Sequence, residues 1–198
     1  ITGADGLRGT VPSAQEQGDL LPETYHYTWG DDAAEMVERM RSAMDETLTQ
    51  LWLTREEALP YRTPYEALIL ASMIEKETSL SQERSHVAAV FVNRLRLGMR
   101  LQSDPTVVFA LTRGRGPLGR ALTRENLKIQ DPYNTYIIDG LPPGPIANPG
   151  RASLVAALHP MNSEDLFFVA DGNGGHVFAK TLREHQRNVT RWRALRNR

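Results

Sequence analysis

Residues 63–78 read TPYEALILASMIEKET, and these letters mark both the start and the buried face of a helix. Thr63 and Glu66 form a capping box, and Pro64 takes the first helical position, where a missing N–H costs nothing. At helical spacing the apolar residues of the segment share one face, and Ser72 lies opposite to it. The sequence therefore predicts an amphipathic helix that begins at Thr63.

Two acidic residues near the end of this helix are expected to meet different surroundings. Glu77 falls on the apolar face, whereas Glu75 points roughly 160° away from it, toward the side of Ser72. Partial burial of a carboxyl disfavours its charged form and raises its pKa toward neutrality, so Glu77 could donate a proton at pH 7. The alternative is that Glu77 turns outward and pairs with an arginine. Helix geometry alone favours that alternative, because acids near helix ends are common.

Composition narrows the class of protein. The chain has 198 residues, enough for one compact unit with a substantial core. Its 23 basic and 24 acidic residues nearly cancel, so nucleic acid is not an expected partner. The sequence contains no cysteine, which excludes disulfides and thiolate catalysis and leaves the compartment open. No apolar run is long enough to span a membrane.

The rest of the chain is expected to be mostly helical with a small sheet. Residues 1–20 lack periodicity and are predicted to be irregular. Apolar residues at helical spacing, with capping residues before them, predict helices over residues 32–52, 81–98, 103–112, 149–158 and from Thr181 onward. Strands are predicted over residues 23–29, 166–170 and 176–179, the last two forming a hairpin. The expected fold class is therefore α+β.

Loops with chemical character follow the central helices. Asp131–Tyr136 and Leu141–Gly150 concentrate turn formers, aromatic rings and amides, which is typical of a shaped loop. The loop Arg113–Arg120 is locally basic, for which a solvated loop is the favoured interpretation and contact with an acidic ligand the alternative.

Common catalytic and metal-binding motifs are absent. The sequence has no His-Glu-x-x-His pattern, no Gly-x-Ser-x-Gly elbow and no Walker motif. The segment Asp171–Gly174 resembles a calcium loop, but Leu182 stands where the bidentate glutamate is needed. We therefore expect no metal and no cofactor. A carboxyl on an apolar helix face, together with a loop that bears tyrosines and amides, suits a sugar polymer.

A set of motifs spread over residues 20–198 resembles one bacterial family. These motifs are Ala71–Thr78, Val92–Leu95, Gly98–Thr106, Tyr133–Tyr136, Gly140–Ile146, Asn148–Gly150, His159–Pro160 and Phe168–His176. On these residues the chain resembles the YceG-like endolytic murein transglycosylases. The pair Glu77–Thr78 is also similar to the Glu-Ser pair of goose-type lysozymes and soluble lytic transglycosylases.

The resemblance implies an architecture and a location. Residues 21–198 would form a mostly helical, lysozyme-like catalytic domain, preceded by the irregular segment 1–20. A LysM-like region and a single-pass anchor would lie upstream of this chain, with the catalytic part on the periplasmic side of the inner membrane. The implied partners are peptidoglycan glycan strands, penicillin-binding proteins and other proteins of cell-wall synthesis.

The resemblance also implies a mechanism. Glu77 would protonate the glycosidic oxygen between MurNAc and GlcNAc, and the MurNAc 6-hydroxyl would then close a 1,6-anhydro ring. Some residues of the loops would bind substrate: Gln102, Ser103 and Asp104 by lining the cleft, and Tyr133, Asn134, Thr135 and Tyr136 by positioning the acetamides and Glu77.

Two other interpretations of the site are possible from the sequence. A muramidase would use water and a second carboxylate about 5 to 10 Å from Glu77, for which Asp104 and Asp139 are the loop candidates. A noncatalytic glycan-binding module would use Glu77 only as a hydrogen-bonding group.

Overall fold

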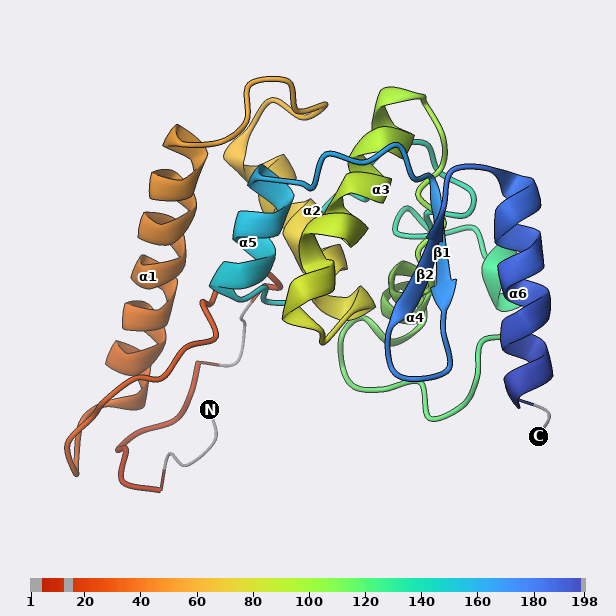
Figure 1. The fold of residues 1–198 in the computed structure, drawn as a ribbon. Coiled ribbons are helices and arrows are strands. Elements are labelled where there is room, and N and C mark those ends of the chain that lie inside the picture. The colour runs from red at the N-terminus through yellow and green to blue at the C-terminus, as the bar shows by residue number, and fades with distance from the viewer. Residues whose placement is uncertain (1–4, 13–15, 197–198) are drawn as a thin grey trace.

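The computed structural model describes residues 5–12 and 16–196. Within these residues it contains six α-helices, two short 3-10 turns and one two-stranded sheet, which confirms the α+β prediction (Figure 1). The helices are α1 Ala33–Leu53, α2 Pro64–Glu77, α3 Arg84–Arg96, α4 Asp104–Thr112, α5 Arg151–Leu158 and α6 Leu182–Arg196. The 3-10 turns are Ser81–Glu83 and Asn126–Lys128, and the strands are β1 Phe167–Ala170 and β2 His176–Ala179. None of the helices in the described part of the chain has the length together with the hydropathy that a membrane span requires. Residues 1–4 and 13–15 of the predicted irregular segment, and residues 197–198, lie outside the described residues.

Helix α2 is the centre of the molecule. The predicted capping box is present: the Glu66 backbone N–H donates to Thr63 Oγ1 at 3.2 Å, and the Thr63 N–H donates to Glu66 Oε2 at 3.0 Å. Helices α1, α3, α4 and α5 all contact α2, so its residues 67–74 are all buried. A helix covered on every side needs no polar face, which explains why α2 is apolar nearly all round.

The expectation that Ser72 faces away from the core was wrong. Its side chain is fully buried, because the loop that carries Ile146 crosses this face of α2. The hydroxyl donates to the Ile69 carbonyl at 2.7 Å and accepts the Ile146 N–H at 3.0 Å. Ser72 therefore satisfies a buried backbone group of the loop, which an apolar residue could not do.

The strand predicted over residues 23–29 is not present. The segment runs alongside α1 with no partner strand, and a side chain bonds one of its carbonyl groups instead. Both terminal guanidinium nitrogens of Arg39 donate to the His26 carbonyl at 3.1 Å. Alternating aromatic residues favour a strand only where a second strand supplies the ladder.

Helix α5 begins two residues later than predicted. Its N-cap is Gly150, whereas Asn148 is used elsewhere: its Oδ1 accepts the N–H groups of Gly18 and Leu20 at 2.8 and 3.2 Å. The end of the N-terminal segment is thereby tied to the loop before α5.

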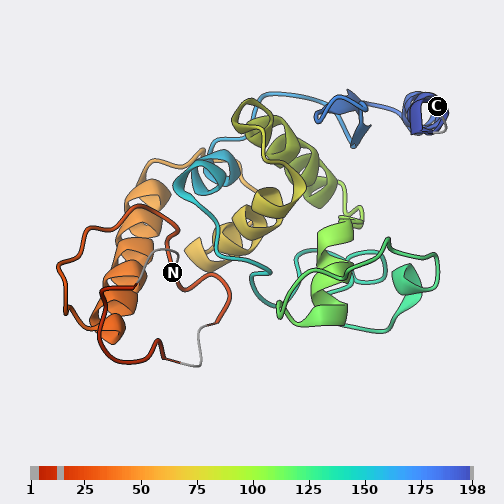
Figure 2. The same cartoon turned by 90° about the horizontal axis from the view of Figure 1, so that it is seen from below.

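The C-terminal hairpin and α6 form one end of the molecule. The strands pair antiparallel from Phe167 opposite Ala179 to Ala170 opposite His176, as the sequence predicted. The ring of Phe168 packs edge-on against Phe91 of α3 at 6.0 Å, which attaches the sheet to the core, and α6 packs on β1 and β2. Seen from below, the hairpin and α6 lie on one side of α3, and α4 with its loops lies on the other (Figure 2).

Candidate active site

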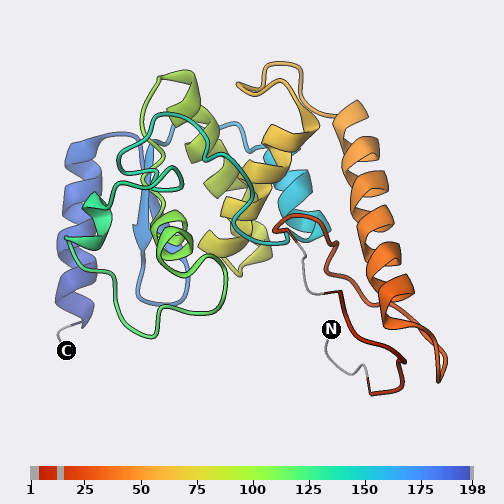
Figure 3. The same ribbon diagram turned by 180° about the vertical axis from the view of Figure 1, so that it is seen from behind.

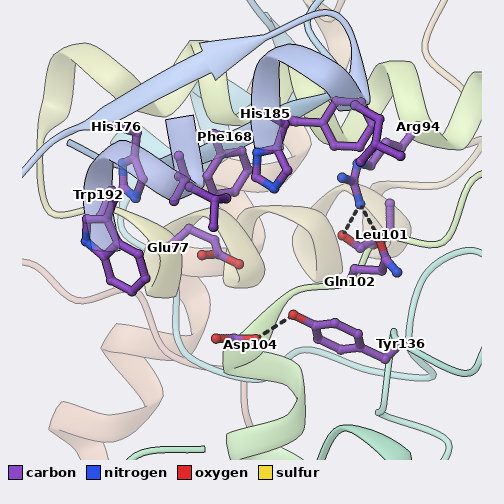
Figure 4. A pocket seen from close by; sticks show the side chains of 15 residues that line it. Glu77, Arg94, Leu101, Gln102, Asp104, Tyr136, Phe168, His176, His185 and Trp192 are labelled. Atoms are coloured by element: carbon purple, nitrogen blue, oxygen red, sulfur yellow. Dashed lines mark hydrogen bonds between the residues drawn. The ribbon is translucent and has the colours of Figure 1, made fainter. Parts of the chain in front are cut away.

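A pocket of about 550 Å³ lies between these two parts of the molecule. One wall comes from the ends of α2 and α4 and from the segments around Gln102 and Tyr136. The other wall comes from β1, β2 and α6 (Figure 4). The lining residues are Glu77, Arg94, Leu101, Gln102, Asp104, Tyr136, Phe167, Phe168, Val169, Ala170, His176, Leu182, His185, Val189 and Trp192. The volume is within the range of natural ligand sites.

Glu77 is the last residue of α2 and lines this pocket. Its Oε1 accepts a hydrogen bond from the Ser103 hydroxyl at 2.5 Å. Burial raises the pKa of the Glu77 carboxyl to about 7; the Ser103 hydrogen bond opposes this rise, and the nearby charge of Asp104 adds to it. A large fraction of Glu77 is therefore protonated near neutral pH, as a general acid requires. The alternative of an outward Glu77 paired with arginine does not hold.

Ser103 reaches Glu77 because the chain turns sharply just before α4. Gln102 adopts a left-handed backbone with φ +52°, a conformation that costs a non-glycine residue about 1 kcal/mol or more. Ser103 occupies the N-cap position of α4 without capping it, since its hydroxyl is bonded to Glu77. Its backbone N–H donates to Thr135 Oγ1 at 2.9 Å, which fixes the turn from behind. The local strain thus places a donor against the acid.

A second carboxylate, that of Asp104, lines the same pocket as Glu77 (Figure 4). Asp104 is the first residue of α4, where the helix dipole favours a negative charge. The Tyr136 hydroxyl donates to its Oδ1 at 2.6 Å. Asp139, the other candidate named from sequence, is exposed and pairs with Arg100 at 3.1 Å, and it does not line the pocket.

Four of the seven predicted substrate-binding residues do not line the pocket. One is Ser103, which is only 2% exposed and bonds to Glu77 instead. Asn134 and Thr135 are fully buried, so the expectation that they face the sugar is corrected. The Asn134 amide donates to the carbonyls of Leu127 and Ile129 at 3.1 and 2.9 Å and so stabilises its own loop. Tyr133 packs against Phe109 with ring centroids 4.7 Å apart and does not line the pocket. Gln102, Asp104 and Tyr136 do line it.

Arg94 is a site residue that sequence reasoning missed. It is only 7% exposed, and its Nε donates to the Leu166 carbonyl at 2.7 Å. Its Nη1 donates to the carbonyls of Arg100 and Leu101, both at 3.0 Å, and to Gln102 Oε1 at 3.3 Å. One guanidinium thus joins Leu166, the residue just before β1, to the segment that leads to Ser103. The sequence did contain a signal: Arg94 is a charged residue on the face of the helix where the other residues are apolar.

The wall formed by the hairpin and α6 was also missed. It brings His176, His185 and Trp192 toward the pocket (Figure 4). Glu83 accepts hydrogen bonds from the backbone N–H of His176 at 2.9 Å and from its ring Nδ1 at 2.8 Å, which fixes the ring. Nothing in the sequence pairs Glu83 with a residue 93 positions away.

Comparison with known proteins identifies the family. Residues 5–191 match the model of the YceG-like family. The chain belongs to the YceG-like family. The resemblance inferred from the motifs is thereby confirmed.

Relatives of this YceG-like chain are longer than it is. A Bacillus subtilis protein named endolytic murein transglycosylase is 37% identical over 182 residues, which cover 91% of this chain and 49% of that protein. A Streptococcus pneumoniae protein of the same name is 32% identical over 179 residues, which cover 87% of this chain and 31% of that protein. The crystal structure of a YceG-like protein from Listeria monocytogenes matches with a TM-score of 0.73 and 39% identity, over 86% of this chain and 54% of that one. The chain spans about half the length of the Bacillus relative.

The two tyrosines of the Tyr133–Tyr136 motif of this YceG-like chain are expected to differ in their effect on turnover. With murein, the substrate named for the relatives, Tyr136→Phe should lower any turnover at this site about ten-fold, because Asp104 loses a charge-assisted hydrogen bond. Tyr133→Phe is the matched control and should change the rate less than two-fold, a negligible effect on the free-energy scale, because Tyr133 lies outside the pocket. Rates and melting temperatures of both variants would be measured together. Equal rates in the two variants would contradict a role for the Tyr136 hydroxyl.

Proposed function

We propose that this chain is the catalytic part of an endolytic murein transglycosylase that cleaves the bond between MurNAc and GlcNAc in peptidoglycan glycan strands. The observation that carries the proposal is a glutamate with a pKa of about 7 in a pocket wide enough for sugar residues. The names of the Bacillus and Streptococcus relatives support the same activity. Cleavage would terminate or release nascent strands.

The two oxygens of Glu77 have different surroundings. Oε1 is bonded to Ser103, whereas Oε2 accepts no hydrogen bond from the residues that the structure describes. The oxygen without a protein partner is the one free to transfer a proton to the glycosidic oxygen. The Ser103 hydroxyl holds the carboxyl in place and stabilises the carboxylate after the proton has left.

The second half of the reaction returns the proton to Glu77. Departure of GlcNAc leaves an oxocarbenium-like MurNAc, which its own acetamide stabilises. The Glu77 carboxylate then removes the proton from the MurNAc 6-hydroxyl, whose oxygen bonds to the anomeric carbon. This hydroxyl is tethered to the reacting ring and so has a high effective concentration compared with water.

A muramidase is the second candidate, and the position of Asp104 is the observation that favours it. A carboxylate in the same pocket as the acid could orient a water molecule or stabilise the cation. Asp104 already accepts a hydrogen bond from Tyr136, which supports a role as a fixed negative charge. We therefore propose the internal attack and retain hydrolysis as the alternative.

Product analysis distinguishes the two reactions. Digestion of purified glycan strands should give MurNAc ends that are lighter than reducing ends by one water and resist borohydride, because internal attack excludes water. Mass spectrometry before and after reduction would measure this. Internal cuts would release oligosaccharides longer than the disaccharides that trimming from a strand end releases. Reducible ends that disappear in Asp104→Asn would establish the muramidase instead, and binding without cleavage would establish the glycan-binding module.

The cellular setting is proposed from the resemblance. A substrate in the cell wall supports an extracytoplasmic location, specifically the periplasmic side of the inner membrane, with an anchor outside this chain. Penicillin-binding proteins and other proteins of wall synthesis are the proposed partners, because cutting of nascent strands has to be coordinated with their elongation.

A further inference from the structure

A second hollow, of about 660 Å³, adjoins the pocket that holds Glu77. Asp104 lines both, so the hollow begins at the N-terminus of α4, where the first pocket ends. The loop that follows α4, drawn in green in Figure 3, forms part of its wall. The lining used below consists of Lys76, Val108, Phe109, Pro117, Arg120 and Ile146.

The hollow carries two cations. Lys76 is exposed and forms no ion pair with any residue that the structure describes. The Nη1 of Arg120 donates to the Ala121 carbonyl at 3.0 Å and to Asn126 Oδ1 at 2.8 Å, which holds the guanidinium in place. Among the described lining residues Asp104 is the only acid, and Tyr136 already donates to it. A ligand of this hollow is therefore expected to bear carboxylates.

The apolar part of the hollow suits small aliphatic groups rather than a sugar ring. Val108, Pro117 and Ile146 present short aliphatic side chains. The Phe109 ring is tilted against Tyr133, with 4.7 Å between centroids, so it is already engaged on that side. The expected ligand thus has carboxylates next to methyl-sized groups. A short acidic peptide of alanine and glutamate has both, and the peptide stem of murein is such a peptide.

We propose that the hollow binds the acidic peptide stem of the MurNAc unit at the cleavage site, an inference that rests on the proposed function. The stem hangs from the lactyl group of the sugar that reacts, so its binding site has to adjoin the catalytic pocket, as this hollow does. Lys76 directly precedes Glu77, but its side chain projects about 100° away around the helix. Glu77 therefore lines the catalytic pocket, and Lys76 lines the hollow. The basic loop Arg113–Arg120 thereby acts on an acidic ligand through Arg120.

The test compares two forms of the substrate. Glycan strands with intact stems and strands stripped of their stems by an amidase would be digested by the wild-type chain and by the double variant Lys76→Gln/Arg120→Gln. The variant should lose about five-fold to ten-fold in kcat/KM on strands with stems, the size expected for two partly exposed ion pairs. On stripped strands it should match the wild type. The matched control is Arg151→Gln, an exposed arginine that lines neither site and should be neutral on both substrates.

Each other result has a definite meaning. Equal losses on both substrates would mean that the hollow holds the glycan, and no loss on either would mean that it holds nothing during cleavage; both overturn the inference. If the wild type cleaves neither substrate, the proposed function fails separately. In that case, binding of a synthetic L-alanyl-γ-D-glutamyl peptide to Glu77→Gln, measured by NMR, tests the inference directly. Binding that becomes weaker when Lys76→Gln and Arg120→Gln are added supports the inference, and absence of binding overturns it.

Discussion

Glu77→Gln is expected to abolish murein cleavage, with a loss of at least about 10³-fold in kcat, because the amide has no transferable proton. The fold should be retained, since the glutamine oxygen can still accept the Ser103 hydrogen bond and the shape of the side chain is unchanged. Release of soluble fragments from purified murein measures the rate, and circular dichroism and thermal unfolding measure the fold.

The matched control is Glu75→Gln. Glu75 accepts the Gly150 N–H at 3.1 Å and the Ser153 hydroxyl at 2.6 Å, so it holds the start of α5 and does not line the pocket. We expect nearly full activity and a loss of stability of about 1 kcal/mol, from weakening of hydrogen bonds to a charged group. The reverse ranking, with Glu75→Gln inactive and Glu77→Gln active, would show that Glu77 is not the general acid.

The pH dependence gives Glu77 an independent signature. Its pKa is raised in the folded chain from 4.5 to about 7, so the folded state binds the proton more tightly than the unfolded state does. Protonation of Glu77 therefore contributes to the free energy of unfolding. This contribution, about 3 kcal/mol, is fully present below pH 4.5 and is lost as the pH rises through about 7. Glu77→Gln should therefore be more stable than the wild type at pH 8, and the gap should close near pH 4. Cleavage by the wild type should fall above pH 7, because the acid form is lost.

Arg94→Met should give the largest loss of stability, about 3–5 kcal/mol, because three backbone carbonyls lose a charged donor in the interior. For a chain of this size the melting temperature should fall by about 10 °C. Turnover at a temperature where the variant is folded should fall about 100-fold, since the segment leading to Ser103 is no longer held. Thermal unfolding and initial rates would be measured side by side.

Arg96→Met, two positions further along α3, is the control. Its guanidinium is exposed and donates to the Ala58 carbonyl at 2.8 Å, so its loss should cost less than about 1 kcal/mol and leave turnover intact. Similar melting temperatures for the two variants would show that the buried hydrogen bonds of Arg94 are not what holds the two walls together. Arg94→Lys should behave like Arg94→Met, because one ammonium cannot reach the Leu166 carbonyl and the segment 100–102 at once.

The elements that could be predicted from sequence are those that local residues specify. A capping box requires only residues three positions apart, so the start of α2 and the turn before α6 were found correctly. The hairpin was found for the same reason, since its strands are joined by five residues of turn chemistry. The strand over residues 23–29 was wrong because a strand needs a distant partner, and the sequence does not say whether one is present.

The sequence by itself determined that α2 forms and where it begins, and it placed Glu77 at the angular position of the apolar residues while leaving an outward, arginine-paired Glu77 as the favoured alternative. These follow from helical periodicity and capping, which act over a few residues. Only the tertiary structure decided what surrounds Glu77: the Ser103 donor, the Asp104 carboxylate, the buried Arg94 and the wall of α6. Each of these comes from a different part of the chain, and their meeting depends on how α2, α3 and the hairpin pack. The pKa of Glu77 is set by that packing, because burial and neighbouring charges are properties of the assembled pocket and not of residue type.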